Sequence, residues 1–199
     1  MGAIGILTAG GDCPGLNAVI RAVTRTCEVA GRQVIGIEEG WDGLMHGKVH
    51  RLTRTDVASI IDHGGTILGT SRLDPYVHGD GYASVRETVE RHDLDAVVVV
   101  GGDGTLRSAA KLAEEGLPCV GVPKTIDNDI ADTDVTFGFH TAVQIATDAI
   151  DRLRTTAESH HRVMLVEVMG RSVVWIAAYA GIAGGADSFL VPEVPWDLD

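Results

Sequence analysis

The stretch that most restricts the fold of this 199-residue chain is Asp95–Thr105, which reads DAVVVVGGDGT. Its four consecutive valines are too few for a helix and are apolar on both faces, as is typical of a central strand in a parallel sheet. A glycine turn follows, and the next residues, LRSAAKLAEE, favour a helix. Glycines let backbone N–H groups approach a ligand, and the positive end of a helix favours an anion. The stretch therefore predicts an anion-binding turn at the end of a buried strand.

One acid, Asp103, stands within this turn. A carboxylate among bare N–H groups is poorly suited to binding phosphate directly, but it suits a site in which Mg²⁺ bridges it to the phosphate. The Walker pattern GxxxxGK[ST] is absent, and the first strand is followed by GGDCPG rather than GxGxxG. These observations argue against a P-loop enzyme and against a dinucleotide oxidoreductase. Taken alone, the GGDGT turn could also be a tight strand-to-helix connection without a function.

Strand-like and helix-like stretches alternate along nearly the whole chain. We expect strands at residues 3–8, 34–37, 64–69, 95–100, 119–122, 163–168 and 188–191, and helices at 16–30, 55–62, after Asp80, up to Glu115, and at 138–157 and 172–183. Residues 38–51 have no clear period and are expected to form a loop. This alternation predicts a doubly wound α/β fold, a mostly parallel sheet with helices on both faces. Without a repeat or a Pro/Ser-rich linker, residues 1–199 are expected to form a single domain with no internal boundary.

Charge and composition narrow the possible partners and the compartment. The net charge of −12 argues against nucleic acid and anionic membranes as partners. The sequence shows neither a secretory signal pattern nor a long uninterrupted apolar span. The three cysteines, Cys13, Cys27 and Cys119, lack the spacing of metal ligands and are expected to be reduced thiols. We therefore expect a cytoplasmic protein.

Five chemically distinctive segments follow predicted strands: GGDCPG, GTSR, GGDGT, PKTIDND and MGR. In an open parallel sheet, ligands bind beyond the carboxyl ends of the strands, so these segments are expected to meet at one edge. The first and third offer glycine N–H groups, and Arg72, Lys124 and Arg171 supply positive charge. Together with the acids, this set of groups is typical of phosphoryl transfer to a hydroxyl.

The chemistry assigns a role to each group. Asp103 would hold Mg²⁺, and Asp127 would accept the proton of the attacking hydroxyl as a general base. Thr125, Arg72 and Arg171 would stabilise negative charge on the transferring group. Each group also has a simpler interpretation when taken alone. The acids of PKTIDND could form a turn that hydrogen-bonds its own backbone, and either arginine could be a solvated surface residue.

Six stretches in this order and spacing resemble the 6-phosphofructokinase family: ILTAGGDCPGLNAVIR, GGTILGTSR, VVGGDGT, PKTIDNDI, HRVMLVEVMGR and AGGADSFLVPE. The resemblance covers essentially the whole chain, whereas GGDGT alone is shared with NAD kinases and diacylglycerol kinases. It implies transfer of the γ-phosphoryl group of ATP to the 1-hydroxyl of fructose 6-phosphate, with Mg²⁺ as cofactor. It also implies a cytoplasmic glycolytic enzyme that assembles as a homo-oligomer, either a dimer or a tetramer.

The resemblance also implies roles for individual residues. The family's ATP-contacting positions fall on Gly11, Arg72, Leu73, Gly102, Asp103, Gly104 and Thr105, with Asp103 at the Mg²⁺ position. Its sugar-phosphate contacts fall on Thr125, Ile126, Asp127, Met169, Gly170 and Arg171, with Asp127 as the base. Arg162 matches an arginine that reaches into the sugar site of a neighbouring subunit.

Two positions bear on the phosphoryl donor. Gly104 resembles the ATP-using members, since pyrophosphate-using members carry an acid there that would intrude where an α-phosphate sits. Lys124 resembles the pyrophosphate-using members, since simple ATP-only bacterial members have glycine. The pair is similar to the mixed-substrate branch of the family, with ATP as the expected donor.

The resemblance also implies that the family's second domain, which supplies more of the sugar-phosphate site, is missing or incomplete after Asp199. We therefore expect a fragment with the donor half of the site and the base, which turns over poorly by itself. Three alternatives remain: a pyrophosphate-dependent enzyme, an inactive or regulatory nucleotide-binding subunit, and another GGDGT kinase acting on NAD or a lipid. The PKTIDND and MGR stretches argue against the last of these.

Overall fold

The computed structural model describes residues 2–77, 80–170, 172–191 and 193–197. By its internal contacts the chain divides into two compact units, Met1–Lys124 and Thr125–Asp199, which are described separately below. The division lies between Lys124 and Thr125, the last two residues of a strand, and the sequence shows no linker there. The expected single domain of residues 1–199 stays a prediction.

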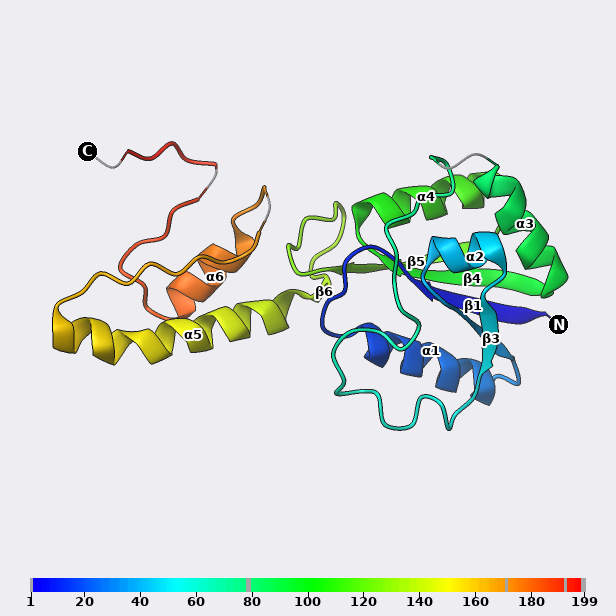
Figure 1. Cartoon of the computed structure of the whole chain (residues 1–199), viewed down its shortest axis with the longest axis horizontal. Coiled ribbons are helices and arrows are strands. Elements are labelled where there is room, and N and C mark those ends of the chain that lie inside the picture. The colour runs from blue at the N-terminus through cyan, green and yellow to red at the C-terminus, as the bar shows by residue number, and fades with distance from the viewer. Residues whose placement is uncertain (1, 78–79, 171, 192, 198–199) are drawn as a thin grey trace. The chain divides into compact units, whose positions relative to one another are not determined.

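The first unit alternates strands and helices (Figure 1). Its elements are β1 (Ala3–Thr8), α1 (Leu16–Val29), β2 (Val34–Ile37), α2 (Trp41–His46), β3 (Val49–Leu52), α3 (Gly81–Arg91), β4 (Leu94–Gly101), α4 (Asp103–Glu114) and β5 (Cys119–Thr125). Among the described residues of this unit the strand order is β3-β2-β1-β4-β5. Strand β1 is parallel to both β2 and β4, β4 is parallel to β5, and β3 runs antiparallel at the edge. The doubly wound, mostly parallel α/β fold predicted from the sequence is confirmed.

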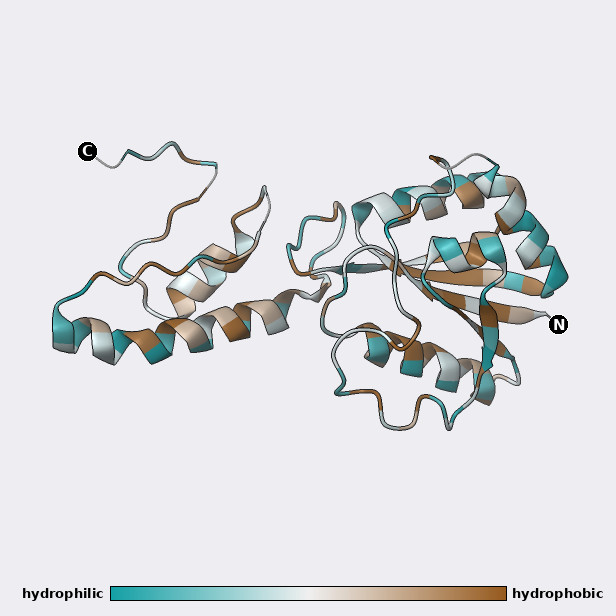
Figure 2. Ribbon diagram, in the orientation of Figure 1, coloured by the Kyte–Doolittle hydropathy of each residue, from teal (hydrophilic) through white to brown (hydrophobic). Residues whose placement is uncertain are grey.

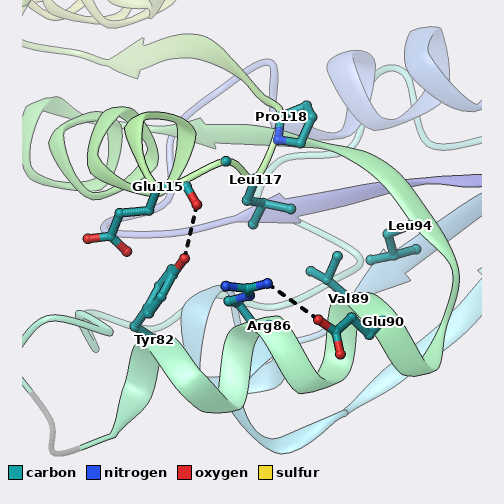
Figure 3. A pocket seen from close by; sticks show the side chains of 9 residues that line it. Tyr82, Arg86, Val89, Glu90, Leu94, Glu115, Leu117 and Pro118 are labelled. Atoms are coloured by element: carbon teal, nitrogen blue, oxygen red, sulfur yellow. Dashed lines mark hydrogen bonds and ion pairs between the residues drawn. The ribbon is translucent and has the colours of Figure 1, made fainter.

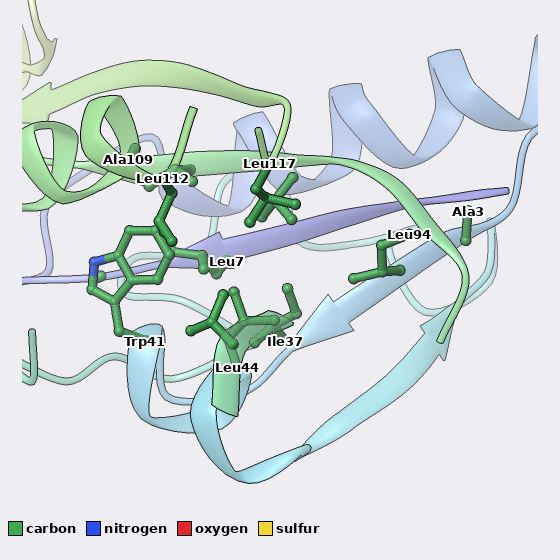
Figure 4. Close-up of a cluster of buried hydrophobic side chains, with 13 residues drawn as sticks. Ala3, Leu7, Ile37, Trp41, Leu44, Leu94, Ala109, Leu112 and Leu117 are labelled. Carbon is green, nitrogen blue, oxygen red and sulfur yellow. The ribbon is translucent and has the colours of Figure 1, made fainter. Parts of the chain in front are cut away.

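The sheet of this unit is covered by helices on both faces, which bury its apolar side chains. Helix α1 lies on one face of the sheet, and α3 and α4 lie on the other (Figure 1). Val97, Val99 and Val100 of β4 are buried because both faces of the strand are covered, and Figure 2 shows the strands as the apolar part of the unit. On the α4 side, Leu7, Ile37 and Trp41 pack with Leu112 in one apolar cluster (Figure 4). Burial of this kind contributes about 25 cal/mol per Å² of apolar surface, so the cluster stabilises the unit.

The second unit is built around one long helix. It contains β6 (Phe137–Gly138), α5 (Phe139–His160) and α6 (Trp175–Ala183). Phe139 and Ala146 of α5 pack against Ile176 and Ala180 of α6, and the rings of Phe139 and Tyr179 meet edge to face at 5.3 Å. Helix α5 ends at His160, and the next residue, His161, has a left-handed backbone (φ 50°) that stops the helix.

Several predicted elements differ from the structure. Residues 38–51, predicted to be a loop, contain α2 and β3. The short helix α2 escapes a search for periodicity because it is only six residues long, and its Gly43 lies against the backbone of Glu38, where a Cβ atom would be 1.7 Å from the carbonyl oxygen. The predicted helix at residues 55–62 and the predicted strand at 64–69 are turns.

The predicted strands at 163–168 and 188–191 are also wrong, since both stretches are described without strand structure. Val163 and Leu165 are 98% and 89% exposed, so the apolar composition of the first stretch is not matched by packing among the described residues. Strand propensity measures the fit of side chains to neighbouring strands, and it does not form a strand alone. Within the described part of the chain, no helix combines the length and apolar character needed to cross a membrane.

Candidate functional site

The carboxyl ends of three neighbouring strands meet at one edge of the first unit. Thr8 at the end of β1 is paired with Val100 of β4, and Gly101 of β4 is paired with Pro123 of β5. The turns that follow β1 and β4 and the last residues of β5 must therefore leave the sheet side by side. This pairing brings GGDCPG, GGDGT and Lys124 together, as the sequence predicted for these three segments.

Gly10 lies at the centre of this edge. Its backbone is left-handed (φ 88°), and a Cβ atom placed there would lie 3.6 Å from Thr105 Oγ1 and 3.7 Å from Lys124 Nζ. The Gly10 N–H donates to the carbonyl of Ser71 at 2.8 Å, and the Thr70 hydroxyl donates to the Gly10 carbonyl at 2.6 Å. The GTSR segment, which ends at the exposed Arg72, is thus attached to the same turn.

Lys124 is a buried cation at this edge. Its side chain is 4% exposed, and its ammonium group donates a hydrogen bond to the carbonyl of Gly11. Burial lowers the pKa of Lys124 below its usual value, the acidic groups of Cys13 and Asp12 oppose this shift, and the charge of Arg72 adds to it. A charge is costly to bury without partners, so the position favours an anion that comes close to the ammonium group.

The GGDGT turn opens helix α4 with two glycines in contrasting surroundings. At Gly101 a Cβ atom would lie 2.4 Å from both Cβ and Cγ2 of Thr105, so a side chain cannot be accommodated without movement. At Gly104, apart from the neighbouring residues and the backbone of α4 itself, no atom lies within 4 Å of the same position. The space above Gly104 at the start of α4 is therefore open, and the helix dipole favours negative charge there.

Asp103 is the first residue of α4, and its carboxylate is 51% exposed. Arg107, one turn further along the helix, holds this carboxylate with Nε–Oδ1 and Nη2–Oδ2 distances of 3.1 and 2.9 Å. Among the described residues, no group of three or more His, Cys, Asp or Glu side chains could hold a metal ion. A single exposed carboxylate nevertheless fits Mg²⁺, which takes most of its ligands from water and substrate phosphates.

The second unit holds the predicted base in an ordered turn. Asp127 is half-buried, and its N–H donates to the Thr125 hydroxyl at 3.1 Å. The buried Thr136 donates its hydroxyl to the Thr125 carbonyl at 2.7 Å, and its N–H donates to the side-chain oxygen of Asn128 at 2.9 Å. Asn128 has a left-handed backbone (φ 52°) and shapes this turn. Thr136, which the sequence analysis missed, is a buried threonine outside any recognisable motif.

The remaining predicted residues differ in how they are placed. Leu73 and Ile126 are half-buried, Met169 is 73% exposed, and Arg162 is exposed at the end of α5. Gly170 lies in a tight turn, where a Cβ atom would be 2.5 Å from the carbonyl oxygen of Val173. Arg171 falls outside the described residues. The meeting of PKTIDND and MGR with the segments of the first unit stays a prediction.

Sequence reasoning missed two other polar residues near the edge of the first unit. Arg107 stands four residues after Asp103, a spacing that places both on the same face of a helix and could have been recognised. Asn17 is buried on the apolar face of α1, between Leu16 and Val19. A polar residue among apolar ones at helical spacing is a weak signal, but it is visible in the sequence.

A pocket of about 220 Å³ lies elsewhere in the first unit, between α3 and the end of α4 (Figure 3). The Tyr82 hydroxyl donates to the carbonyl of Glu115 at 3.2 Å, and Arg86 pairs with Glu90 at 3.6 Å along its wall. Leu94, at the start of β4, also lines it. Since this is the amino end of the strand, the pocket is separate from the site at the carboxyl ends.

Comparisons with known proteins identify relatives of the chain. Residues 3–199 match the family model described as Phosphofructokinase. The chain is 56% identical over 197 residues to an ATP-dependent 6-phosphofructokinase 3 of Streptomyces coelicolor and 55% identical to a pyrophosphate–fructose 6-phosphate 1-phosphotransferase of Amycolatopsis methanolica. Each alignment covers 98% of this chain and 58% of the relative, so the chain spans less than two thirds of their length.

Two solved structures show the same fold. Phosphofructokinase of Pichia pastoris in the T-state matches with a TM-score of 0.89 at 36% identity, covering 94% of this chain and 22% of that one. The structure of phosphofructokinase from Saccharomyces cerevisiae matches with a TM-score of 0.87 at 34% identity, covering 94% of this chain and 28% of that one.

Proposed function

The chain belongs to the phosphofructokinase family, and from this premise we propose that it carries the donor half and the base of a 6-phosphofructokinase site. The reaction would transfer the γ-phosphoryl group of ATP to the 1-hydroxyl of fructose 6-phosphate, giving fructose 1,6-bisphosphate and ADP. The observation that carries the proposal is the edge where Gly10, Lys124 and the GGDGT turn meet. Backbone N–H groups, a buried cation and a helix N-terminus on neighbouring strands suit a phosphate chain.

In this proposal the groups at the edge bind and orient the donor. Gly11, Gly102 and Thr105 lie along the phosphates, Arg72 and Leu73 contact the nucleotide, and Asp103 holds Mg²⁺. When bound, Mg²⁺ neutralises charge on the phosphate oxygens. Arg107 must release the Asp103 carboxylate for this to happen, and an exposed ion pair of this kind is worth only about 0.3–0.5 kcal/mol.

Asp127 would accept the proton of the sugar hydroxyl, and Thr125 and Arg171 would stabilise charge on the transferring group. A preorganised donor in such a position typically lowers the barrier by about 3–4 kcal/mol. Chain connectivity supports a shared role for Lys124 and Asp127. Three residues of extended chain span at most about 10–11 Å, so the Cα atoms of Lys124 and Asp127 cannot be farther apart than this. A phosphoryl group and a sugar hydroxyl fit within that reach.

We also propose ATP as the donor. The open space at Gly104 supports this choice, because the α-phosphate of ATP needs room that an acid would fill. The donor named for the relatives differs between ATP and pyrophosphate, so the main alternative keeps the acceptor and changes the donor to pyrophosphate. The variant Gly104→Asp should lower the rate with ATP more than the rate with pyrophosphate. An unchanged ATP rate in this variant would remove the argument.

The acceptor site is proposed to use Thr125, Ile126, Asp127, Met169, Gly170 and Arg171. Arg162, exposed after α5, would reach the sugar site of a neighbouring copy, so we propose a homo-oligomer, a dimer or a tetramer. We further propose a cytoplasmic protein without nucleic-acid or membrane partners, for which the net charge of −12 is the support.

The test combines donor binding and turnover. Calorimetry with Mg²⁺ and a non-hydrolysable ATP analogue should show binding that weakens at least about tenfold in Asp103→Asn. The matched control, Glu114→Gln, changes an exposed acid at the other end of the same helix and should leave binding unchanged. Equal binding by both variants would contradict the role of Asp103.

A coupled assay with fructose 6-phosphate and either ATP or pyrophosphate then measures turnover. Asp127→Asn should lower the turnover by about 10²- to 10⁴-fold while donor binding persists. Because the chain spans 58% of its relatives, we expect low turnover from these residues alone. Near-normal turnover would show that the acceptor site is complete, and donor binding without any turnover would favour an inactive or regulatory nucleotide-binding subunit.

A further inference from the structure

Residues 63–71 lead into the proposed phosphate-binding residue Arg72, yet they form neither helix nor strand. A segment of this kind is mobile unless other groups fix it, because few backbone hydrogen bonds hold it. Two buried polar side chains from neighbouring elements hold this segment. One is Asn17 of α1 and the other is Thr8 of β1.

The carboxamide of Asn17 binds both ends of one bend in the segment. Its Nδ2 group donates to the carbonyls of His63 at 3.1 Å and Gly64 at 3.4 Å, and its Oδ1 atom accepts from the N–H of Ile67 at 2.8 Å. Asn17 is 2% exposed, so water cannot easily replace these bonds. A buried amide with donor and acceptor both used fixes its partners strongly, because any shift leaves a polar group unpaired.

Thr8 holds the next part of the same segment. The Thr8 hydroxyl donates to the carbonyl of Gly69 at 2.8 Å, and the Thr66 Oγ1 atom lies 2.8 Å from Thr8 Oγ1. Leu68 between them is 1% exposed. Hydrogen bonds at Ile67 and Gly69, on either side of the buried Leu68, therefore clamp the segment to α1 and β1.

The clamped segment then joins the glycine turn of the donor site. Ser71 accepts from the Gly10 N–H, and Thr70 donates to the Gly10 carbonyl. The carbonyl of Gly11, the next residue, accepts from Lys124. Arg72 follows directly, so these bonds hold the backbone that leads into the arginine.

We propose that Asn17 is a positioning residue for the donor site, which holds residues 63–71 so that Arg72 faces the phosphate. The inference rests on the proposed function for its ligand. It adds a residue that touches no ligand and acts through Arg72. Loss of the Asn17 carboxamide should therefore weaken donor binding only to the extent that Arg72 contributes to it.

The test compares Asn17→Leu with Thr24→Val. Thr24 is also 2% exposed, lies on the same face of α1, and bonds only within its own helix, to the carbonyl of Ile20. In hydrogen exchange on the whole chain, Asn17→Leu should speed exchange in residues 64–71 at least about tenfold, as expected when a buried hydrogen bond is lost. Thr24→Val should leave that segment unchanged. Equal exchange in the two variants would overturn the clamp.

Binding of Mg²⁺ with the ATP analogue separates positioning from general destabilisation. Asn17→Leu should weaken binding about tenfold in the otherwise unchanged chain but less than twofold when Arg72 is already alanine. Fully additive losses would overturn the proposal. If the unchanged chain binds no donor, the proposed function fails; if it binds and Asn17→Leu binds equally well, only the present inference fails. Should Asn17→Leu not fold, Thr70→Val removes the bond to Gly10 and should give the same non-additive loss.

Discussion

Replacing Gly101 by alanine tests whether the GGDGT turn is fixed by close packing. The new Cβ atom would lie 2.4 Å from both Cβ and Cγ2 of Thr105 and 2.8 Å from Oγ1. Carbon atoms at contact are about 3.5–4.0 Å apart, so the overlap exceeds 1 Å. Shortening the threonine would not relieve it, because Thr105 Cβ itself is in the way. The first turn of α4 must therefore move, at a cost of about 1–3 kcal/mol.

The matched control is Gly104→Ala, three residues further along. Nothing lies within 4 Å of the new Cβ atom, and alanine is favoured over glycine in a helix by about 1 kcal/mol. Urea unfolding followed by circular dichroism should therefore give a lower midpoint for Gly101→Ala and an equal or higher one for Gly104→Ala, with unchanged slopes. The packing argument is wrong if Gly101→Ala is as stable as the unchanged chain.

Three further predictions follow from the described contacts. Burial raises the pKa of the Cys13 thiol from 9.0 to about 11. Iodoacetamide at pH 8 should therefore modify this thiol roughly 100-fold more slowly than in the urea-unfolded chain, as measured by mass spectrometry of the Cys13 peptide. Equal rates of modification would contradict the burial of Cys13. Phe139→Ala should cost about 3–5 kcal/mol, and hydrogen exchange should show the loss in α5 and α6 while β1 and β4 keep their protection. Arg107→Ala should change the midpoint of urea unfolding little, because its ion pair with Asp103 is exposed; a loss above about 1 kcal/mol would show that the pair supports the fold.

The parts of the fold that could be predicted are those whose cause is local. The four valines of β4 and the glycine turn after them gave a strand, an anion-binding turn and a helix, because strand burial and glycine geometry depend on a few neighbouring residues. Parallel pairing then placed the ends of β1, β4 and β5 side by side.

The parts that could not be predicted depend on contacts between distant residues. Residues 64–69 carry an apolar run between glycines and were predicted to be a strand, but their backbone groups bond to Asn17, Glu39 and Thr8, which lie 29 to 61 positions away in the sequence. Lys124 was recognised for its charge, whereas its burial against the Gly11 carbonyl comes from a partner 113 residues away. No local pattern contains such information.

Strand β5 has a practical consequence for anyone who wishes to study the two units apart. The division between them falls between Lys124 and Thr125, inside the strand rather than in a loop. If residues 1–124 and 125–199 were expressed separately, the first product would lack Thr125, the last residue of β5. Dissection of the chain should therefore keep β5 whole.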